Sequence, residues 1–299
     1  MRCFVMINGG TGKSIMATAM MPLLAKKYDE VYVCSPYVDV FKACSYVTEA
    51  IPVGQPNTYR DLLLDDDVEL LCTEPYQNGK FIKKQCHLFE AWADEWKIEL
   101  EQDPMDMHPI LDKWDDLDGA VKQYQEAKRG WGDKFILVQF TGGQSPLVDP
   151  NQMGQYNEQI EGIKRNYHKG QELINAIHAK YPDYVIVHYG LPNEPTYQYT
   201  VKMPLPYLAY RKACEDASAV ITIDSSLQHL ASGVNDKTIV IWGETAPEHF
   251  GYNSHHNLRD KHIKNTQPYF QPLGASPLRV PFPTVDEVMT ELDKLISAE

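Results

Sequence analysis

The sequence predicts an α/β protein made of two doubly wound, Rossmann-like domains. Short apolar runs that favour strands alternate with amphipathic segments that favour helices along the chain. A glycine-containing turn follows the first predicted strand of each half, at residues 8–14 and 141–145. With 299 residues and 43% hydrophobic residues, the chain is long enough for two cores. Ligands of such folds bind at the carboxyl ends of strands, so we expect a cleft between the two domains to hold them.

The first half begins with a predicted strand at residues 2–7 and a glycine loop at residues 8–14. A helix to about residue 28 and a strand at 30–34 follow. The loop is similar to the phosphate-binding loop of nucleoside triphosphatases, which remains an alternative. That motif requires a glycine five residues before Gly12, and Ile7 stands there.

Further α/β units are expected between residues 35 and 130. The pattern predicts a helix at 37–45, a strand at 68–72, a helix at 83–100 and a helix at 119–129, with an irregular connector at 101–118. Trp92 and Trp96 lie on the apolar face of the third of these segments, which favours packing over a sugar-stacking platform. We place the domain boundary after residue 130, beside Gly130 and Gly132.

The second half repeats the alternation. We expect a strand at 134–140, the turn at 141–145, a helix at 158–180, a strand at 184–189 and a helix at 206–218. We therefore assign residues 1–130 and 131–283 to the two domains. Residues 284–299 form a C-terminal helix, capped by Thr284, which we expect to pack back toward the cleft.

Residues 217–252 carry the most informative pattern. A buried strand at 220–223 leads to Asp224, Ser225 and Ser226, then to a short amphipathic segment and a second strand at 238–242. The polar residues therefore lie where a strand ends and a helix starts, and free backbone N–H groups there can receive an anion. We interpret residues 224–229 as a phosphate and sugar contact of a nucleotide-linked ligand. The alternative is that Ser225 only caps the helix.

The same stretch resembles the donor-binding segment of glycosyltransferases of the ADP-heptose:lipopolysaccharide heptosyltransferase type (glycosyltransferase family 9). The resemblance rests on Asp224-Ser225-Ser226, on His229-Leu230-Ala231, and on Gly243-Glu244-Thr245-Ala246-Pro247. It implies the GT-B architecture and a nucleotide-diphosphate sugar as donor. It also implies a donor site that includes a sugar contact at Asp224, a ribose contact at Glu194 and phosphate contacts. The expected donor-binding residues are Thr141, Gly142, Gly143, Glu194, Asp224, Ser225, Ser226, Leu227 and His229.

The resemblance at the first glycine loop includes a departure. It implies an acceptor-side loop of Gly9, Gly10, Thr11, Gly12 and Lys13. The family has an aspartate, thought to deprotonate the acceptor hydroxyl, where this chain has Lys13. Lys13 would act as a base only with a strongly lowered pKa, and otherwise would be a cation that meets a phosphate or carboxylate. A solvent-exposed lysine at a helix start is the remaining alternative. We take Lys13 and Asp224 as the candidate catalytic residues.

Composition limits the partners. The net charge of −13 gives little electrostatic support for nonspecific binding to nucleic acid or anionic membranes. No apolar run is long enough for a transmembrane helix, and the N-terminus does not resemble a signal peptide. The six cysteines lack CxxC spacing and are expected to be reduced and buried, so we predict a cytoplasmic protein. The histidines show no metal-binding motif, and neither a metal nor a cofactor is expected.

The expected function is metal-independent transfer of a sugar from a nucleotide-diphosphate sugar to a hydroxyl acceptor, in a saccharide or lipid-linked saccharide. The family's lysine and tryptophan after the threonine turn are absent from residues 144–154, so ADP-heptose itself is not indicated. One alternative is transfer to a hydroxylated base in modified DNA. Another is a sugar-nucleotide-binding protein without activity, because Lys13 replaces the aspartate.

Overall fold

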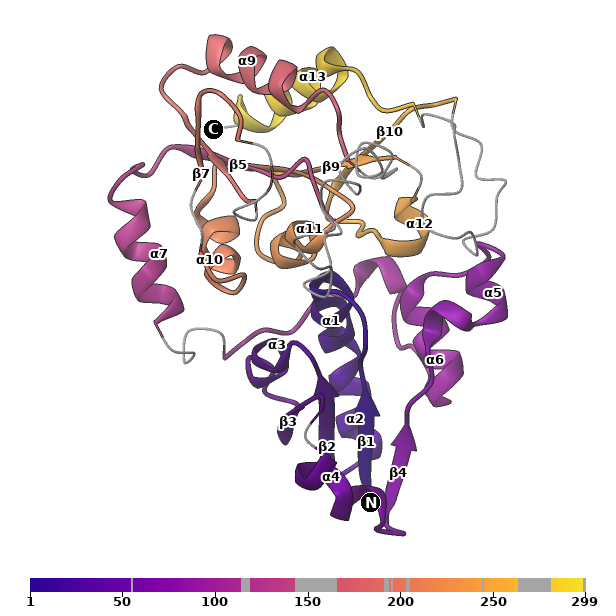
Figure 1. The fold of residues 1–299 in the computed structure, drawn as a ribbon. Coiled ribbons are helices and arrows are strands. Elements are labelled where there is room, and N and C mark those ends of the chain that lie inside the picture. Colours follow the sequence, from indigo (N-terminus) through magenta and orange to yellow (C-terminus); the bar gives the residue numbers. More distant parts are fainter. Residues whose placement is uncertain are drawn as a thin grey trace, which may run out of the picture. The chain divides into compact units, whose positions relative to one another are not determined.

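The computed structural model describes residues 1–54, 56–113, 119–142, 166–190, 194, 196–202, 205–243, 245–262 and 281–297. The chain divides into two compact units, Met1–Ala120 and Val121–Glu299. Each has a parallel sheet with helices packed against it (Figure 1). The prediction of an α/β protein with two Rossmann-like parts is therefore confirmed.

The first unit has a four-stranded sheet in the order β3-β2-β1-β4. Its elements are β1 (Arg2–Met6), α1 (Thr11–Ala17), η1 (Thr18–Met20), α2 (Met21–Lys27), β2 (Glu30–Ser35), α3 (Val38–Lys42), β3 (Glu49–Pro52), α4 (Pro56–Leu63), β4 (Val68–Leu71), η2 (Pro75–Gln77), α5 (Gly79–Ile82), α6 (Leu88–Trp96) and η3 (Pro104–Asp106). All its strand pairs are parallel, so the carboxyl ends of all four strands lie along one edge.

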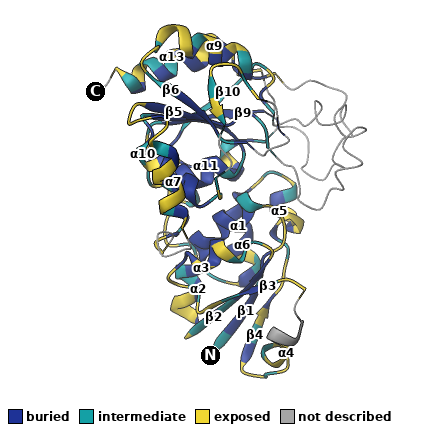
Figure 2. Cartoon of the chain, turned by 60° about the vertical axis from the view of Figure 1, so that its left-hand side comes forward, coloured by how far each residue is buried: buried dark blue, intermediate teal, exposed yellow. Residues whose placement is uncertain are grey.

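The second unit has a six-stranded parallel sheet in the order β10-β9-β8-β5-β6-β7. Its elements are α7 (Ala120–Lys128), β5 (Phe135–Val138), α9 (Gly170–Lys180), β6 (Val185–His188), β7 (Thr200–Lys202), α10 (Ala209–Asp216), β8 (Ala219–Ile223), α11 (Ser226–Ala231), β9 (Thr238–Trp242), α12 (Pro247–Phe250), β10 (His256–Arg259) and α13 (Val285–Ile296). Strands β5, β8 and β9 are buried along their whole length. Figure 2 shows β5 and β9 in the dark blue of buried residues. Helices cover both faces of this sheet, which explains the unbroken apolar sequences of these three strands.

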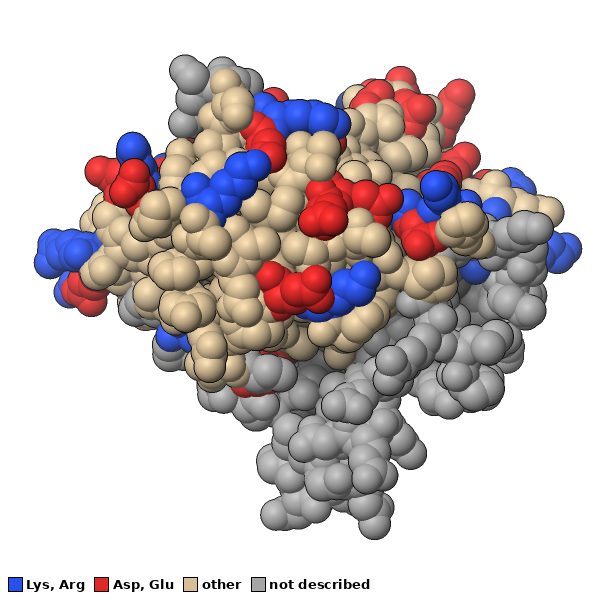
Figure 3. All heavy atoms as spheres, turned by 90° about the horizontal axis from the view of Figure 1, so that it is seen from above, with Lys and Arg blue, Asp and Glu red and all other residues tan. Residues whose placement is uncertain are grey.

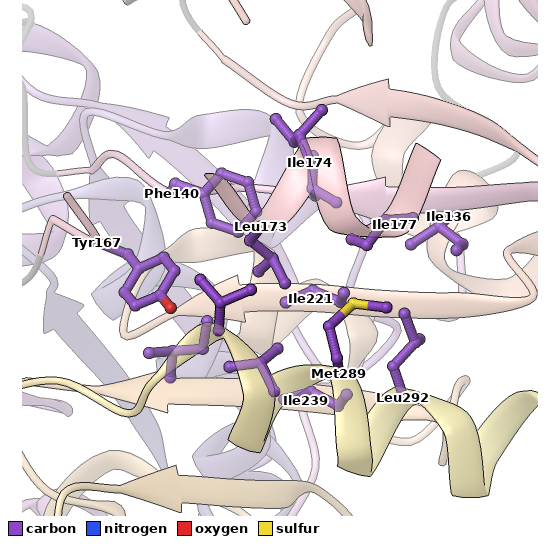
Figure 4. Close-up of a cluster of buried hydrophobic side chains, with 14 of the residues drawn as sticks. Ile136, Phe140, Tyr167, Leu173, Ile174, Ile177, Ile221, Ile239, Met289 and Leu292 are labelled. Atoms are coloured by element: carbon purple, nitrogen blue, oxygen red, sulfur yellow. The ribbon is translucent and has the colours of Figure 1, made fainter. Parts of the chain in front are cut away.

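The largest core of the second unit lies between its sheet and two helices. Side chains of α9 and α13 pack on Ile136, Ile221 and Ile239 of the three central strands (Figure 4). Thr284 caps α13 as expected, because its hydroxyl accepts from the Glu287 N–H while Glu287 accepts from the Thr284 N–H. We expected this helix to pack back toward a cleft. Within the second unit it packs on α9, β8 and β9, and its expected place toward a cleft stays a prediction.

Three local predictions need correction. The helix expected at 83–100 is α6 alone, which is shorter because the imidazole and backbone of His87 form a capping box with Glu90 and the backbone of Lys97 turns left-handed at φ 52°. Residues 256–259 form an edge strand, β10, in a stretch for which no strand was predicted. Five of the six free cysteines are buried as expected, but Cys72 is exposed. Trp92 and Trp96 are buried, which confirms their packing role.

Candidate functional site

The strand order of the second unit places a switch point between β5 and β8. The chain runs outward from β5 through β6 to β7, and then returns to the other side of β5 as β8, β9 and β10. Loops from adjacent strands diverge at such a point and leave a crevice at their carboxyl ends, where α/β proteins bind ligands. Thr141 and Gly142 follow β5, and Asp224 and Ser225 follow β8. Thr141, Gly142, Asp224 and Ser225, four of the sequence-predicted donor residues, therefore follow the two strands that flank the switch point.

Gly142 and Ser225 approach each other closely. A Cβ on Gly142 would lie 2.8 Å from Ser225 Oγ, so any larger residue there would force Ser225 to shift. The Gly142 N–H donates to Asn166 Oδ1 at 3.0 Å. Gly143, also predicted to bind donor, lies outside the described residues. The Thr141 hydroxyl is buried and has no hydrogen-bond partner among the described residues.

Asp224 directly follows the central strand β8 and is only 5% exposed. Its Oδ1 accepts a hydrogen bond of 2.7 Å from Gln228 Nε2, one helical turn away, which fixes the orientation of the carboxylate. Ser225 occupies the N-cap position of α11, but its side chain makes no capping hydrogen bond. The alternative that Ser225 only caps the helix therefore lacks the bond that defines it.

Ser226 and Leu227 begin α11. Ser226 Oγ lies 3.4 Å from the Tyr189 hydroxyl, whereas the Leu227 side chain is fully buried, which leaves only its backbone for a ligand. The helix has six residues, and Arg211 Nη1 donates to the Leu230 and Ser232 carbonyls at its other end.

His229 points into the protein. Its Nδ1 lies 2.9 Å from the hydroxyl of Tyr252, a residue with no exposed surface. Burial raises the pKa of the Tyr252 phenol well above its ordinary value. The ring of His229 is itself 4% exposed, so its described contact is with this buried tyrosine.

Glu194 follows β6, the neighbour of β5. Its side chain is 8% exposed, and its Oε2 would lie 2.8 Å from a Cβ on Gly190. His188, the last residue of β6, lies against the same glycine and was missed by sequence reasoning. Burial, and then the charge of Lys202, lowers the pKa of His188 to about 4, so its ring is neutral at pH 7.

Two more polar groups lie at this edge of the sheet. Thr245 follows β9 and Arg259 ends β10. Within the described part of the chain, the Thr245 hydroxyl and the Nε and Nη2 of Arg259 are buried without a hydrogen-bond partner. Buried polar groups are nearly always hydrogen-bonded, so we include Thr245 and Arg259 among the candidate site residues. Thr245 was part of the sequence resemblance, whereas no pattern pointed to Arg259.

The first unit has a second switch point, between β1 and β4. The glycine loop after β1 positions Lys13: Gly9 adopts φ 111°, and a Cβ on it would lie 3.1 Å from Lys13 Cδ. Gly10 is the N-cap of α1, which Thr11 and Gly12 begin.

The Lys13 side chain is only 4% exposed, so the alternative of a solvent-exposed lysine is wrong. Its Nζ lies 2.7 Å from both carboxylate oxygens of Glu74, which follows β4, and 4.9 Å from the centre of the Tyr76 ring. Burial lowers the pKa of Lys13, and the hydrogen bond and charge of Glu74 oppose that shift. Glu74 had no signal in the sequence.

The described parts of the chain contain no group of three or more His, Cys, Asp or Glu side chains that could hold a metal ion. No helix in those parts has the length and apolar character that a membrane span requires.

Residues 194–271 match the family model of glycosyltransferase family 9 (heptosyltransferase). The matched segment begins at Glu194 and includes Asp224, Ser225, His229 and Thr245. Over its whole length the chain has the fold of solved heptosyltransferases. Its two Rossmann-like units correspond to the GT-B architecture of these enzymes.

Solved structures with this fold match the chain over nearly its whole length. The glycosyl transferase family 9 protein of Veillonella parvula DSM 2008 has a TM-score of 0.65 and 13% identity, with coverage of 100% of this chain and 98% of that one. The E. coli ADP-heptose lipopolysaccharide heptosyltransferase II has a TM-score of 0.65 and 13% identity, and the match covers 100% of this chain and 99% of that one. The E. coli heptosyltransferase WaaC, solved with ADP, has a TM-score of 0.55 and 12% identity, and the match covers 99% of this chain and 100% of that one. A search of curated proteins finds no match.

Proposed function

We propose that the protein is a glycosyltransferase that moves a sugar from a nucleotide-diphosphate sugar to a hydroxyl acceptor. The observation that carries this proposal is the switch point of the second sheet. There Asp224 is oriented by Gln228, Gly142 and Ser225 touch, and the Thr141 hydroxyl is buried without a partner among the described residues. The heptosyltransferase fold and the family match over residues 194–271 support it.

In the proposed donor complex, Asp224 contacts the sugar and Glu194 the ribose. The hydroxyl of Thr141 and the backbone N–H groups at Ser225, Ser226 and Leu227 contact the diphosphate. The Gly142 N–H would join them only after exchanging Asn166 for a phosphate oxygen. His229 has an indirect role, because its ring is hydrogen-bonded to the buried Tyr252.

Catalysis would rest on stabilisation of the charge that develops on the leaving diphosphate. Preorganised N–H and hydroxyl donors can supply a large part of a rate enhancement in this way. We propose that these donors suffice without a metal ion, in which case EDTA leaves the transfer rate unchanged. The six free cysteines support action in a reducing compartment, and we propose the cytoplasm.

The first experiment is isothermal titration with ADP, UDP, GDP and CDP. ADP heads the panel because the similar WaaC was solved with it. The protein should bind at least one nucleoside diphosphate. With a hydroxyl acceptor present, the protein should convert the corresponding nucleotide sugar and release that nucleoside diphosphate as a product.

Asp224→Ala tests the site directly. We expect a loss of turnover of at least about 100-fold, in the range of other single electrostatic contacts, with the affinity for the nucleoside diphosphate retained. Asp236→Ala is the matched control, because Asp236 is an exposed aspartate beyond the far end of α11. No nucleotide binding, together with an Asp224→Ala variant identical to the wild type, would reject the proposal.

A second candidate is a sugar-nucleotide-binding protein without transfer activity. It is favoured by the Lys13–Glu74 pair, because the family resemblance implies an aspartate at the position of Lys13. Donor binding without turnover on any acceptor and without donor hydrolysis would support it. Transfer to a base in modified DNA remains an alternative acceptor. Basic side chains on the face in Figure 3 are interspersed with acidic ones, an arrangement that does not favour a duplex.

A further inference from the structure

We infer that Glu74 is the general base that takes the proton of the acceptor hydroxyl, and that Lys13 is the residue that positions it. This inference rests on the proposed function, because a sugar transfer to a hydroxyl must release that proton. It assigns the base to a residue that no sequence pattern marked.

The position of Glu74 in the fold supports this role. The first sheet runs from β1 through β2 to β3, and then returns to the other side of β1 as β4. Lys13 follows β1 and Glu74 follows β4, so the pair spans the switch point at the carboxyl edge of the sheet. That edge is where the fold accommodates a substrate.

The two partners differ in accessibility. The Glu74 side chain is 33% exposed, whereas that of Lys13 is 4% exposed. A substrate can therefore approach the carboxylate, while the ammonium lies behind it. A group has to come within hydrogen-bond reach of the proton that it removes, and of the two only Glu74 has the exposed surface for such an approach.

The orientation of the carboxylate is well defined. Lys13 Nζ lies 2.7 Å from both of its oxygens, and the Tyr76 N–H donates to Oε1 at 3.2 Å. Two charge-assisted contacts and a backbone donor restrict the side chain to one arrangement. Lys13 is itself held between the loop at Gly9 and the ring of Tyr76.

The chemical step balances without any further reactant. The acceptor oxygen forms a bond to the anomeric carbon while the bond from that carbon to the diphosphate oxygen breaks, and the electron pair leaves with the nucleoside diphosphate. The proton of the acceptor hydroxyl passes to Glu74. That hydroxyl becomes strongly acidic as its oxygen bonds to carbon, so a carboxylate is a sufficient base.

The experiment compares Glu74→Gln with Glu69→Gln in the full-length protein. Glu69 is a matched control, because it lies on β4, accepts a hydrogen bond from Tyr28 and pairs with Lys27, but is remote from the carboxyl edge. The substrate is whichever of ADP-heptose, ADP-glucose, UDP-glucose and GDP-mannose gives the fastest wild-type release of nucleoside diphosphate. Methyl glycosides and water serve as acceptors.

Glu74→Gln keeps the size of the side chain and an oxygen for Lys13, but removes the base. We expect kcat to fall at least about 100-fold, as for other general bases. The affinity for the nucleoside diphosphate should match that of Glu69→Gln, whose kcat stays at the wild-type level. Because neutralising Glu74 leaves the buried Lys13 ammonium without its counter-charge, kcat is compared at a temperature at which both variants are folded. Glu74→Asp should recover part of kcat. Lys13→Arg should retain more of kcat than Lys13→Met, while KM for the donor is unchanged in both.

Two results would overturn the inference, and they are distinguishable. If the wild type transfers sugar and Glu74→Gln keeps its kcat, the pair is only a structural ion pair and the proposed function stands. If the wild type binds the nucleoside diphosphate but releases none from any nucleotide sugar, the proposed function fails, and the assignment of a base fails with it.

Discussion

Gly142 and Ser225, which follow neighbouring strands of the second sheet, touch so closely that a methyl group on Gly142 would lie 2.8 Å from Ser225 Oγ and 3.2 Å from its Cβ. Gly142→Ala should therefore strain the loop and lower the free energy of unfolding by roughly 1–3 kcal/mol. Chemical denaturation measures this. Gly142→Ala/Ser225→Gly should recover most of the loss, and Gly79→Ala is the control because a Cβ there has no neighbour within 4 Å. An unchanged stability in Gly142→Ala would contradict the contact.

The His229–Tyr252 hydrogen bond should contribute to stability. Tyr252→Phe removes a fully buried hydroxyl that lies 2.9 Å from His229 Nδ1 and should lower the free energy of unfolding by about 1–3 kcal/mol. Tyr46→Phe is the comparison, because Tyr46 is 44% exposed. If both variants unfold at the same denaturant concentration, the buried bond contributes nothing measurable.

His188 should make stability depend on pH. Its pKa is about 4 in the folded protein and 6.5 when unfolded, so the unfolded chain binds the proton more readily. The free energy of unfolding is therefore highest above pH 6.5, where the His188 ring is neutral in both states. It falls as pH decreases toward 4, by at most about 3 kcal/mol. Denaturation between pH 7.5 and 5 should show this slope. His188→Met should flatten it, and an equal slope in both proteins would show that the folded ring titrates normally.

The capping box of α13 gives a test of the second core. Thr284→Ala removes the hydroxyl that accepts from the Glu287 N–H and should lower the free energy of unfolding by about 1 kcal/mol. Thr284→Ser keeps the hydroxyl acceptor and should keep the free energy of unfolding close to that of the wild type. Thr290→Ala, which removes only a hydroxyl that donates to the Asp286 carbonyl within the same helix, should have a smaller effect.

The sequence predicted the elements whose local pattern is strong. Strands β5, β8 and β9 are continuous apolar runs because both faces of their sheet are covered, and α13 carries its own cap at Thr284. Strand β10 was missed because its residues, His256–Arg259, are half-buried and mixed in character at a sheet edge. The start of α6 was misplaced because histidine is an uncommon N-cap.

The candidate site was predictable only in part. Asp224 and Ser225 stand at a strand end that local pattern reveals. Glu74 pairs with Lys13 across 61 residues, and this partnership follows from β4 lying beside β1, which no local pattern specifies. The contact of His229 with Tyr252 likewise depends on how the loop after α12 folds back.

The burial of Lys13 behind Glu74 has a consequence for how this protein changes over evolutionary time. Loss of the glutamate alone would leave an uncompensated ammonium group inside the first unit, whereas loss of the lysine alone would release the carboxylate from its anchor. Descendants that abandon one partner should therefore soon abandon the other. A comparison of natural relatives should show the two positions varying together, with few intermediates.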